Sequence, residues 1–78
     1  MNNAEKAIHS GIAYDKVCKA LEQLELICKA EGLVGVGVIS ATQPLIDAQK
    51  YVLDIMVNAL NSSSLEELEA ARIKIKGE

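Results

Sequence analysis

The 78 residues are enough for one domain, and the apolar fraction of 50% is too high for a disordered chain. The net charge of −3 argues against a surface that binds nucleic acid, and so does the placement of the eight basic residues, of which Arg72, Lys74 and Lys76 lie near the C-terminus and the others are scattered among acids. Tyr14 and Tyr51 are the only aromatic residues, so the core must be aliphatic, as is typical of a helical assembly. A domain this small buries only about 60% of its unfolded surface, and oligomerisation is a common source of additional stability.

The first predicted helix covers Asn3–Ile12. The chain can bend at Gly11 and begin a new helix there, because Ser10 or Asp15 suits the N-cap position. The alternative is one continuous helix with a second contact face that includes Leu26. We favour the break, because a capping residue is available for the new helix.

The first principal helix is predicted over Ala13–Glu31. Its apolar residues recur at spacings of three and four, which places them on one face of a helix. This predicted core stripe comprises Ala13, Val17, Ala20, Leu21, Leu24, Ile27 and Cys28, with Tyr14 at its edge. Gly32 follows the helix and suits the left-handed conformation of a C-terminal cap.

The segment Leu33–Ile39 is ambiguous, because its β-branched residues favour a strand while Gly35 and Gly37 weaken one. A lone strand has no partner within the chain. Three alternatives are open: pairing with the same segment of another copy, a buried connection, or a helix packed closely through its glycines. We favour a buried connection, irregular or helical.

The second principal helix is predicted from Pro44 to Asn61, with Ser40 or Thr42 as its cap. Its apolar arc spans roughly 200°, about twice the width expected of a surface helix. The main stripe comprises Leu45, Ala48, Val52, Ile55, Met56, Ala59 and Leu60, and a second stripe comprises Ile46, Leu53 and Val57. We expect the main stripe to pack on the first principal helix and the second stripe to contact another molecule.

The final helix is predicted from Leu65 to about Ile75, and Ser64 with Glu67 forms a capping box at its start. Its apolar stripe is thin, so weak docking is expected; the stripe comprises Leu65, Leu68 and Ile75. The acids of its first turns complement the helix dipole, and contact with a basic partner surface is the alternative. These acids are Glu66, Glu67 and Glu69.

The two cysteines, Cys18 and Cys28, are ten residues apart. On one helix this spacing separates them by about 15 Å, beyond the ~7 Å limit between the Cα atoms of a disulfide. An intermolecular disulfide is possible. Two reduced cysteines in a cytoplasmic protein is the interpretation that we favour.

No motif predicts a reaction, a cofactor or a metal site. Gly35 and Gly37 match only the beginning of a dinucleotide fingerprint, and close backbone packing explains them better. His9, the single histidine, is expected at the surface, and together with the cysteines it matches no zinc spacing. Asp47 and Asp54 lie about 10 Å apart on a helix, too far for one ion. We therefore expect a protein that is not an enzyme.

The predicted fold is all-α: one domain, residues 1–78, with two antiparallel principal helices and shorter terminal helices. Its excess apolar surface predicts a homo-oligomer. The predicted oligomer or partner interface comprises Leu26, Ile46, Leu53, Val57 and Leu60.

The expected function is that of a small regulator or inhibitor that binds a larger protein, by analogy of size and composition with antirepressors and accessory inhibitors. Two alternatives are a scaffold subunit of a homo-assembly and a binder of a small ligand at an oligomer interface lined by Gly35 and Gly37. A cytoplasmic location is expected, because Met1–Lys6 lead into no secretory signal and no stretch is long and apolar enough to span a membrane.

Overall fold

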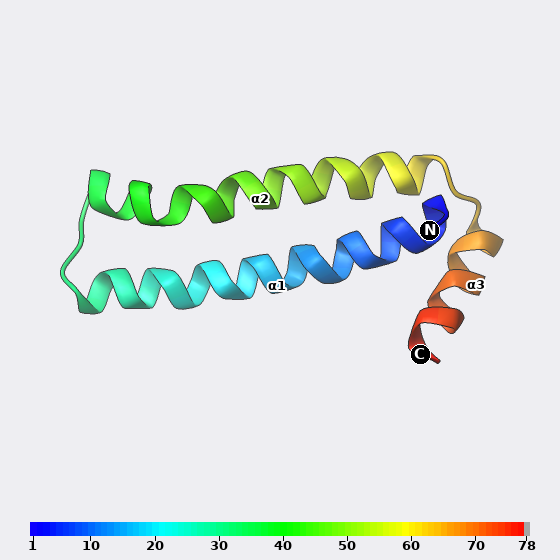
Figure 1. The fold of residues 1–78 in the computed structure, drawn as a ribbon, viewed down its shortest axis with the longest axis horizontal. Coiled ribbons are helices and arrows are strands. Elements are labelled where there is room, and N and C mark those ends of the chain that lie inside the picture. The colour runs from blue at the N-terminus through cyan, green and yellow to red at the C-terminus, as the bar shows by residue number, and fades with distance from the viewer. Residues whose placement is uncertain (78) are drawn as a thin grey trace.

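The computed structural model describes residues 1–77, which form three α-helices (Figure 1). α1 covers Asn3–Ala30, α2 covers Val36–Asn61 and α3 covers Leu65–Lys76. α1 and α2 lie antiparallel, side by side, as one long hairpin, and α3 packs on α1 at the end of the hairpin that holds the N-terminus. The described part of the chain is all-α, as predicted, and elongated, with extents of 49 × 23 × 16 Å.

α1 is continuous through Gly11, so the predicted break at this residue is wrong. Gly11 lies against α2, and a Cβ atom at this position would be 3.7 Å from the Met56 sulfur. Packing along α2 therefore holds the helix together across a residue that costs about 1 kcal/mol relative to alanine. Ile8 and Ile12 belong to the same continuous helix, as the alternative interpretation required.

Both ends of α1 are determined by local hydrogen bonds. At the start, the side chain of Asn2 accepts a hydrogen bond from the backbone N–H of Glu5 at 2.8 Å. At the end, Gly32 has a φ of 72°. This left-handed residue lets the Leu33 N–H donate to the Cys28 carbonyl at 2.9 Å, the pattern of a Schellman motif. The predicted role of Gly32 is confirmed.

α2 begins at Val36, eight residues before the predicted start at Pro44. Val36–Ile39 is thus helical, but the predicted burial of Leu33–Ile39 is wrong. Val38 is half-buried, and the other apolar residues of this segment are exposed, namely Leu33, Val34, Val36 and Ile39. Figure 1 shows this segment beside the last turns of α1, at the end of the hairpin away from α3. Gly35 has a φ of 56° and no atom within 4 Å of an added Cβ, so its backbone conformation, not close packing, favours glycine.

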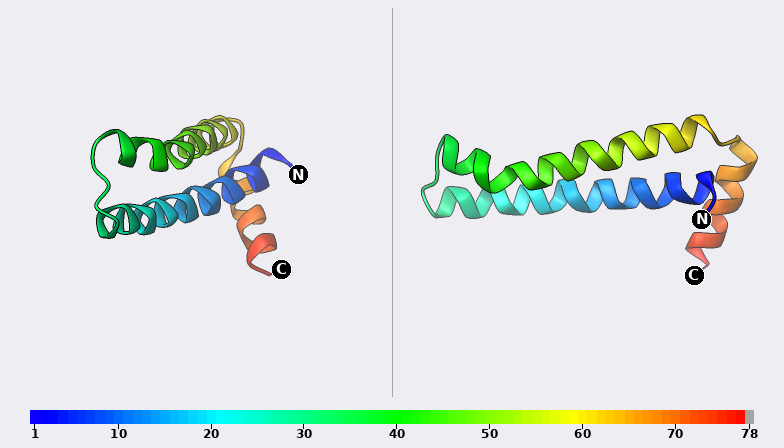
Figure 2. Two further views of the ribbon diagram at one scale, coloured as in Figure 1. Left: turned by 60° about the vertical axis from the view of Figure 1, so that its left-hand side comes forward. Right: turned by 45° about the horizontal axis from the view of Figure 1, so that its top comes forward.

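Pro44 lies in the interior of α2, so neither Ser40 nor Thr42 caps this helix. Proline has no N–H, and the carbonyl four residues earlier loses its usual partner. The buried Thr42 hydroxyl donates to the Val38 carbonyl at 2.8 Å within the same turn. Figure 2 shows the first turns of α2 set at an angle to the remainder, as expected of a helix with an internal proline.

The core of the hairpin contains only small buried apolar side chains. Within residues 1–77, three alanines and Cys28 are buried on the hairpin and Ala71 is buried on α3, and no large side chain is completely covered. Half-buried larger residues flank them along the two helices, namely Val17, Leu21, Leu24, Leu45, Val52, Ile55 and Met56. Ile27, predicted for the core stripe, is 58% exposed, and Ala20 is also exposed. The stripe is wider than the surface that one neighbouring helix covers, so its edge stays uncovered.

α3 begins with the predicted capping box. The Ser64 hydroxyl accepts from the Glu67 N–H at 3.1 Å, and the Glu67 carboxylate accepts from the Ser64 N–H at 3.0 Å. Ala71 is buried, but Leu65, predicted for the docking stripe, is 86% exposed. Lys74 of α3 lies 3.5 Å from the carboxylate of Glu5 on α1.

Candidate functional site: an apolar stripe on α2

The most regular exposed apolar surface follows α2 and is here named the α2 stripe. Four of its members are spaced by seven residues, and Val57 lies between the last two. The α2 stripe comprises Ile39, Ile46, Leu53, Val57 and Leu60. All are exposed except Ile46, which is half-buried. A seven-residue repeat drifts by only about 20° per heptad on a straight helix, so the members that follow Pro44 form one continuous line. Ile39 precedes the bend at Pro44 and extends the repeat by one further step.

Two contacts between the helices locate this line relative to α1. The side-chain amide of Gln49 donates to the sulfur of Cys18 at 3.1 Å, and Met56 lies against Gly11. Gln49 and Met56 therefore belong to the face of α2 that packs against α1. Leu53 and Leu60 follow them by four residues, which rotates each by about 40° farther from α1. The α2 stripe thus lies along one side of the contact between α1 and α2.

The structure places three predicted interface residues, Leu53, Val57 and Leu60, together as exposed members of the α2 stripe. Ile46 belongs to the same line but is half-buried. Leu26 is exposed as well, but it belongs to α1 and lies outside the stripe. No observation tests whether any of them contacts another molecule, so their role in an interface stays a prediction.

Sequence reasoning missed Ile39 as a member of this surface, because Leu33–Ile39 was interpreted as a buried connection. The signal was present in the seven-residue spacing, which extends from Leu60 back through Leu53 and Ile46 to Ile39. The assumption that α2 starts at Pro44 removed Ile39 from the pattern.

A polar edge accompanies the α2 stripe on its outer side. Lys50 is exposed at this edge, next to the exposed carboxylates Asp47 and Asp54. Gln43 donates a side-chain hydrogen bond to Asp47 at 2.8 Å. The edge therefore mixes one positive charge with two negative ones, and it lacks the concentrated positive charge that phosphate binding requires.

The acidic residues of α3 have local partners. Hydrogen bonds from the backbone N–H and hydroxyl of Ser64 hold the pKa of the Glu67 carboxyl below its ordinary value. Glu69 pairs with Arg72 at 2.6 Å. Glu66 lies at a shallow depression on the outer face of α3, whose other lining residues are Leu65, Glu69, Ala70 and Ile73. The helix-end role is confirmed for Glu67, and contact with a basic partner stays a prediction for all three acids.

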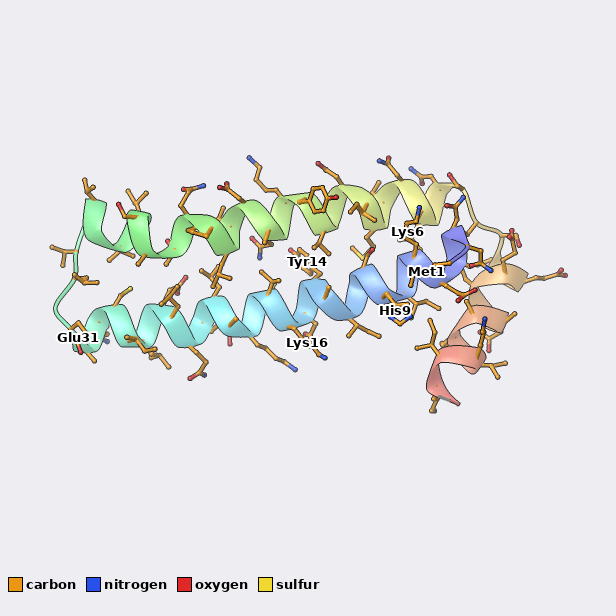
Figure 3. The ribbon with its side chains drawn as sticks, viewed as in Figure 1. Met1, Lys6, His9, Tyr14, Lys16 and Glu31 are labelled. Carbon is orange, nitrogen blue, oxygen red and sulfur yellow. The ribbon has the colours of Figure 1, made fainter. Side chains whose placement is uncertain are left out.

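The remaining reactive side chains are spread along the hairpin. Figure 3 shows Tyr14 between α1 and α2, and His9 on the side of α1 that is turned away from α2. His9 is half-buried rather than fully at the surface. Cys18 is half-buried and Cys28 buried, and both are free thiols. Within residues 1–77, no cluster of three His, Cys, Asp or Glu side chains is arranged to hold a metal ion.

A second depression lies on the hairpin at the end that holds the N-terminus. It is lined by Asn3, Lys6, Ile55, Asn58, Ala59 and Ser62. Its walls combine two amides, one ammonium, one hydroxyl and aliphatic carbons, without a buried charged group.

None of the helices in residues 1–77 has the length and apolar character needed to cross a membrane. Comparison with protein-family models, with curated proteins and with solved structures gives no match to this chain. The physical chemistry of its own residues is therefore what indicates a function.

Proposed function

We propose that this chain is a homo-oligomeric helical interaction module that regulates or inhibits a larger protein, and that copies meet along the α2 stripe. The observation that carries the proposal is the composition of the core. Within the residues that the structure describes, one copy buries only alanine and cysteine among its apolar residues, while Leu53, Val57 and Leu60 stay exposed in a continuous line. Soluble monomers rarely expose large continuous apolar patches, and such patches commonly mark interaction surfaces.

The expected energy of this contact supports a dimer that depends on most of the stripe. Full burial of one Leu, Ile or Val side chain stabilises by about 1.5–3 kcal/mol, and these side chains are already about half covered. Each member therefore contributes about 1 kcal/mol when a second copy covers it. Ten such side chains in a dimer give about 10 kcal/mol, which exceeds the cost of association only toward the lower end of its range of about 4–15 kcal/mol, so the dimer needs nearly every member of the stripe.

The test compares two substitutions on α2. Leu53→Lys places a charge inside the stripe at a residue that is 38% exposed, and Tyr51→Lys places the same charge at a residue outside it that is 68% exposed. For the unsubstituted chain, we expect light scattering to give a mass that is a multiple of 8.4 kDa. Leu53→Lys should shift the mass to the monomer, and Tyr51→Lys should leave it unchanged.

A monomeric mass for the unsubstituted chain at about 100 μM, far above the Kd of a stable dimer, would contradict the proposal. If Leu53→Lys leaves the oligomer intact, the copies do not meet along the α2 stripe, and this part of the proposal is wrong. Circular dichroism of each variant separates dissociation from unfolding, because a dissociated hairpin keeps its helices.

A scaffold subunit is the second candidate, and apolar residues away from the α2 stripe favour it. Ile27 on α1, and Leu65 with Ile73 on α3, are exposed on other parts of the surface. A molecule with several such surfaces can bind more than one neighbour and form an open-ended series. A discrete dimer in light scattering favours the regulator, and a mass that rises continuously with concentration favours the scaffold.

The proposed partner of the oligomer is a larger protein. A cytoplasmic location, with both thiols reduced, is the compartment in which we expect the two to meet. Purification of the tagged chain and of its Leu53→Lys variant from the native host tests for this partner. A partner that the dimer binds should be retained by the unsubstituted chain and lost with the variant, whereas no retained protein under mild conditions would count against a regulator.

A further inference from the structure

We propose that the end of the hairpin opposite α3 inserts into the surface of an electrically neutral lipid bilayer. This end carries four exposed apolar residues, here named the hairpin tip, namely Ile27, Leu33, Val34 and Val36. The inference goes beyond the proposed self-association, because none of these residues belongs to the α2 stripe.

The hairpin tip gathers apolar side chains from both helices and from the connection between them. Ile27 lies in the last turn of α1, and Val36 is the first residue of α2. In the connection, Leu33 is exposed and Val34 is 80% exposed. The tip is extended within one further turn of each helix by two more exposed residues, Leu26 and Ile39. A continuous exposed patch of this kind commonly marks an interaction surface.

The charges around the hairpin tip favour a neutral surface as its partner. Between Glu31 and Asp47 the chain contains no charged residue. The nearest charged residues on α1 are Glu25 and Lys29. One base beside two acids forms no basic cluster of the kind that binds acidic lipids. Contact at this end therefore depends on the burial of apolar side chains.

The position of the hairpin tip lets a flat surface reach it. Figures 1 and 2 show the connection at one end of the elongated hairpin, away from α3. A bilayer can touch this end while the charged sides of the helices stay in water. The apolar faces of peripheral proteins enter a bilayer by about 5–10 Å, a depth that one or two turns at the end of a helix can reach.

The small size of the hairpin tip favours a bilayer over a second copy or another protein. A standard protein interface takes about 20–30 residues from each partner, more than the whole segment from Leu26 to Ile39 supplies. A bilayer surface needs no matching shape, and each apolar side chain that leaves water contributes separately.

The start of α2 is suited to the phosphate layer of a bilayer. Its N-cap is Gly35, which has no side chain to accept a hydrogen bond from the first turn, and this turn contains no acid. The N–H groups at the start of a helix carry partial positive charge and bind phosphate oxygens. Free donors are costly in hydrocarbon, so we expect the tip to stay at the level of the headgroups.

Single tryptophans test the location of the contact, because the chain contains no tryptophan of its own. Val34→Trp places the reporter in the hairpin tip. Leu65→Trp is the matched control at the other end of the molecule, at a residue that is 86% exposed. With phosphatidylcholine vesicles, the emission of Val34→Trp should shift to shorter wavelength and be quenched by lipids brominated in their acyl chains. Leu65→Trp should show neither effect.

Charged replacements test the apolar contribution. Val34→Asp combined with Val36→Asp should lower the partition coefficient onto the same vesicles by about 100-fold, because each valine that enters the bilayer contributes about a ten-fold factor. Leu65→Asp with Ile73→Asp is the control and should keep the partition coefficient unchanged. An acid in the first turn of α2 also complements the helix dipole, so the tip variant should keep its helices, which circular dichroism checks.

The dependence on lipid and salt separates apolar burial from attraction between charges. Binding should need no acidic lipid and should be the same at about 0.05 and 0.5 M salt. Binding that requires phosphatidylglycerol and disappears with salt would overturn the inference. No binding to phosphatidylcholine vesicles, or equal quenching of both tryptophans, would overturn it as well.

Light scattering without lipid separates this inference from the proposed function. If the variant with Val34→Asp and Val36→Asp has a lower mass than the unsubstituted chain, the hairpin tip contacts another copy, and the inference is wrong. A monomeric mass of the unsubstituted chain contradicts only the proposed function, because the hairpin tip lies outside the α2 stripe.

Discussion

The amide of Gln49 donates a hydrogen bond to the sulfur of Cys18 at 3.1 Å, and so joins the middle of α2 to the middle of α1. Both side chains are half-buried. Because the remaining contacts across the hairpin are mainly between aliphatic groups, this directional contact helps to determine how far one helix is shifted along the other. The position of α2 along α1 also determines which residues of α1 lie next to the α2 stripe.

Replacement of Cys18 tests this contact. Cys18→Ala leaves the half-buried amide without its acceptor, and we expect the free energy of unfolding to fall by about 1 kcal/mol. Cys18→Ser keeps an acceptor of similar shape and should recover most of that loss. Urea unfolding followed by circular dichroism measures both variants, and equal losses for the two would show that the hydrogen bond contributes nothing.

Gly11→Ala should stabilise the protein. The new Cβ meets only the Met56 sulfur, at an ordinary contact distance of 3.7 Å, and alanine favours the interior of a helix. We expect the free energy of unfolding to rise by about 0.5–1 kcal/mol. Gly32→Ala is the matched control and should destabilise, because Gly32 has a positive φ. A loss of stability in Gly11→Ala would mean that α1 needs a flexible residue at this point.

Pro44→Ala should also stabilise the protein, because it restores a backbone donor in the interior of α2. A proline in a helix interior costs about 3 kcal/mol, so an increase of about 1–3 kcal/mol in the free energy of unfolding is expected. Gln43→Ala, at an exposed neighbouring position, should change it by less than about 0.5 kcal/mol. Thermal unfolding distinguishes the two, and an unstable Pro44→Ala would show that the bend in α2 is required for packing.

The capping box makes α3 sensitive to acid. Since the folded pKa of Glu67 is lowered, its contribution to stability is present above the ordinary value of 4.5 and is lost as the pH falls through the folded pKa. We expect faster amide hydrogen exchange in α3 below that range, after correction for the intrinsic rate, with α1 less affected. Glu67→Gln should abolish most of the pH dependence of hydrogen exchange in α3. If this pH dependence is unchanged in the variant, Glu67 is not its cause.

Loss of the serine hydroxyl should weaken the same helix at neutral pH. Ser64→Ala removes the acceptor for the Glu67 N–H, a change that costs about 1 kcal/mol at helix N-caps. Hydrogen exchange should show the loss in α3 and not in the hairpin. The exposed Ser62, whose hydroxyl bonds to the Asn58 carbonyl, provides the control substitution Ser62→Ala.

The sequence by itself determined the helix ends that depend on neighbouring residues. Gly32 ends α1 and Ser64 begins α3, as predicted, because the hydrogen bonds of a cap join atoms within a few residues of one another. It also determined the all-α class, since apolar residues at spacings of three and four specify a helix wherever the chain lies. The exposed line through Leu53 and Val57 was found in the same way.

Only the tertiary structure decided what happens where local preference and packing disagree. Gly11 and Pro44 both disfavour a helix interior, yet both lie inside one, because long contacts along the hairpin outweigh a local cost of about 1–3 kcal/mol. The structure also shows that α2 begins at Val36 and that Ile27 stays exposed. A helix wheel shows which residues share a face, but the neighbour that covers part of that face is determined by the whole fold.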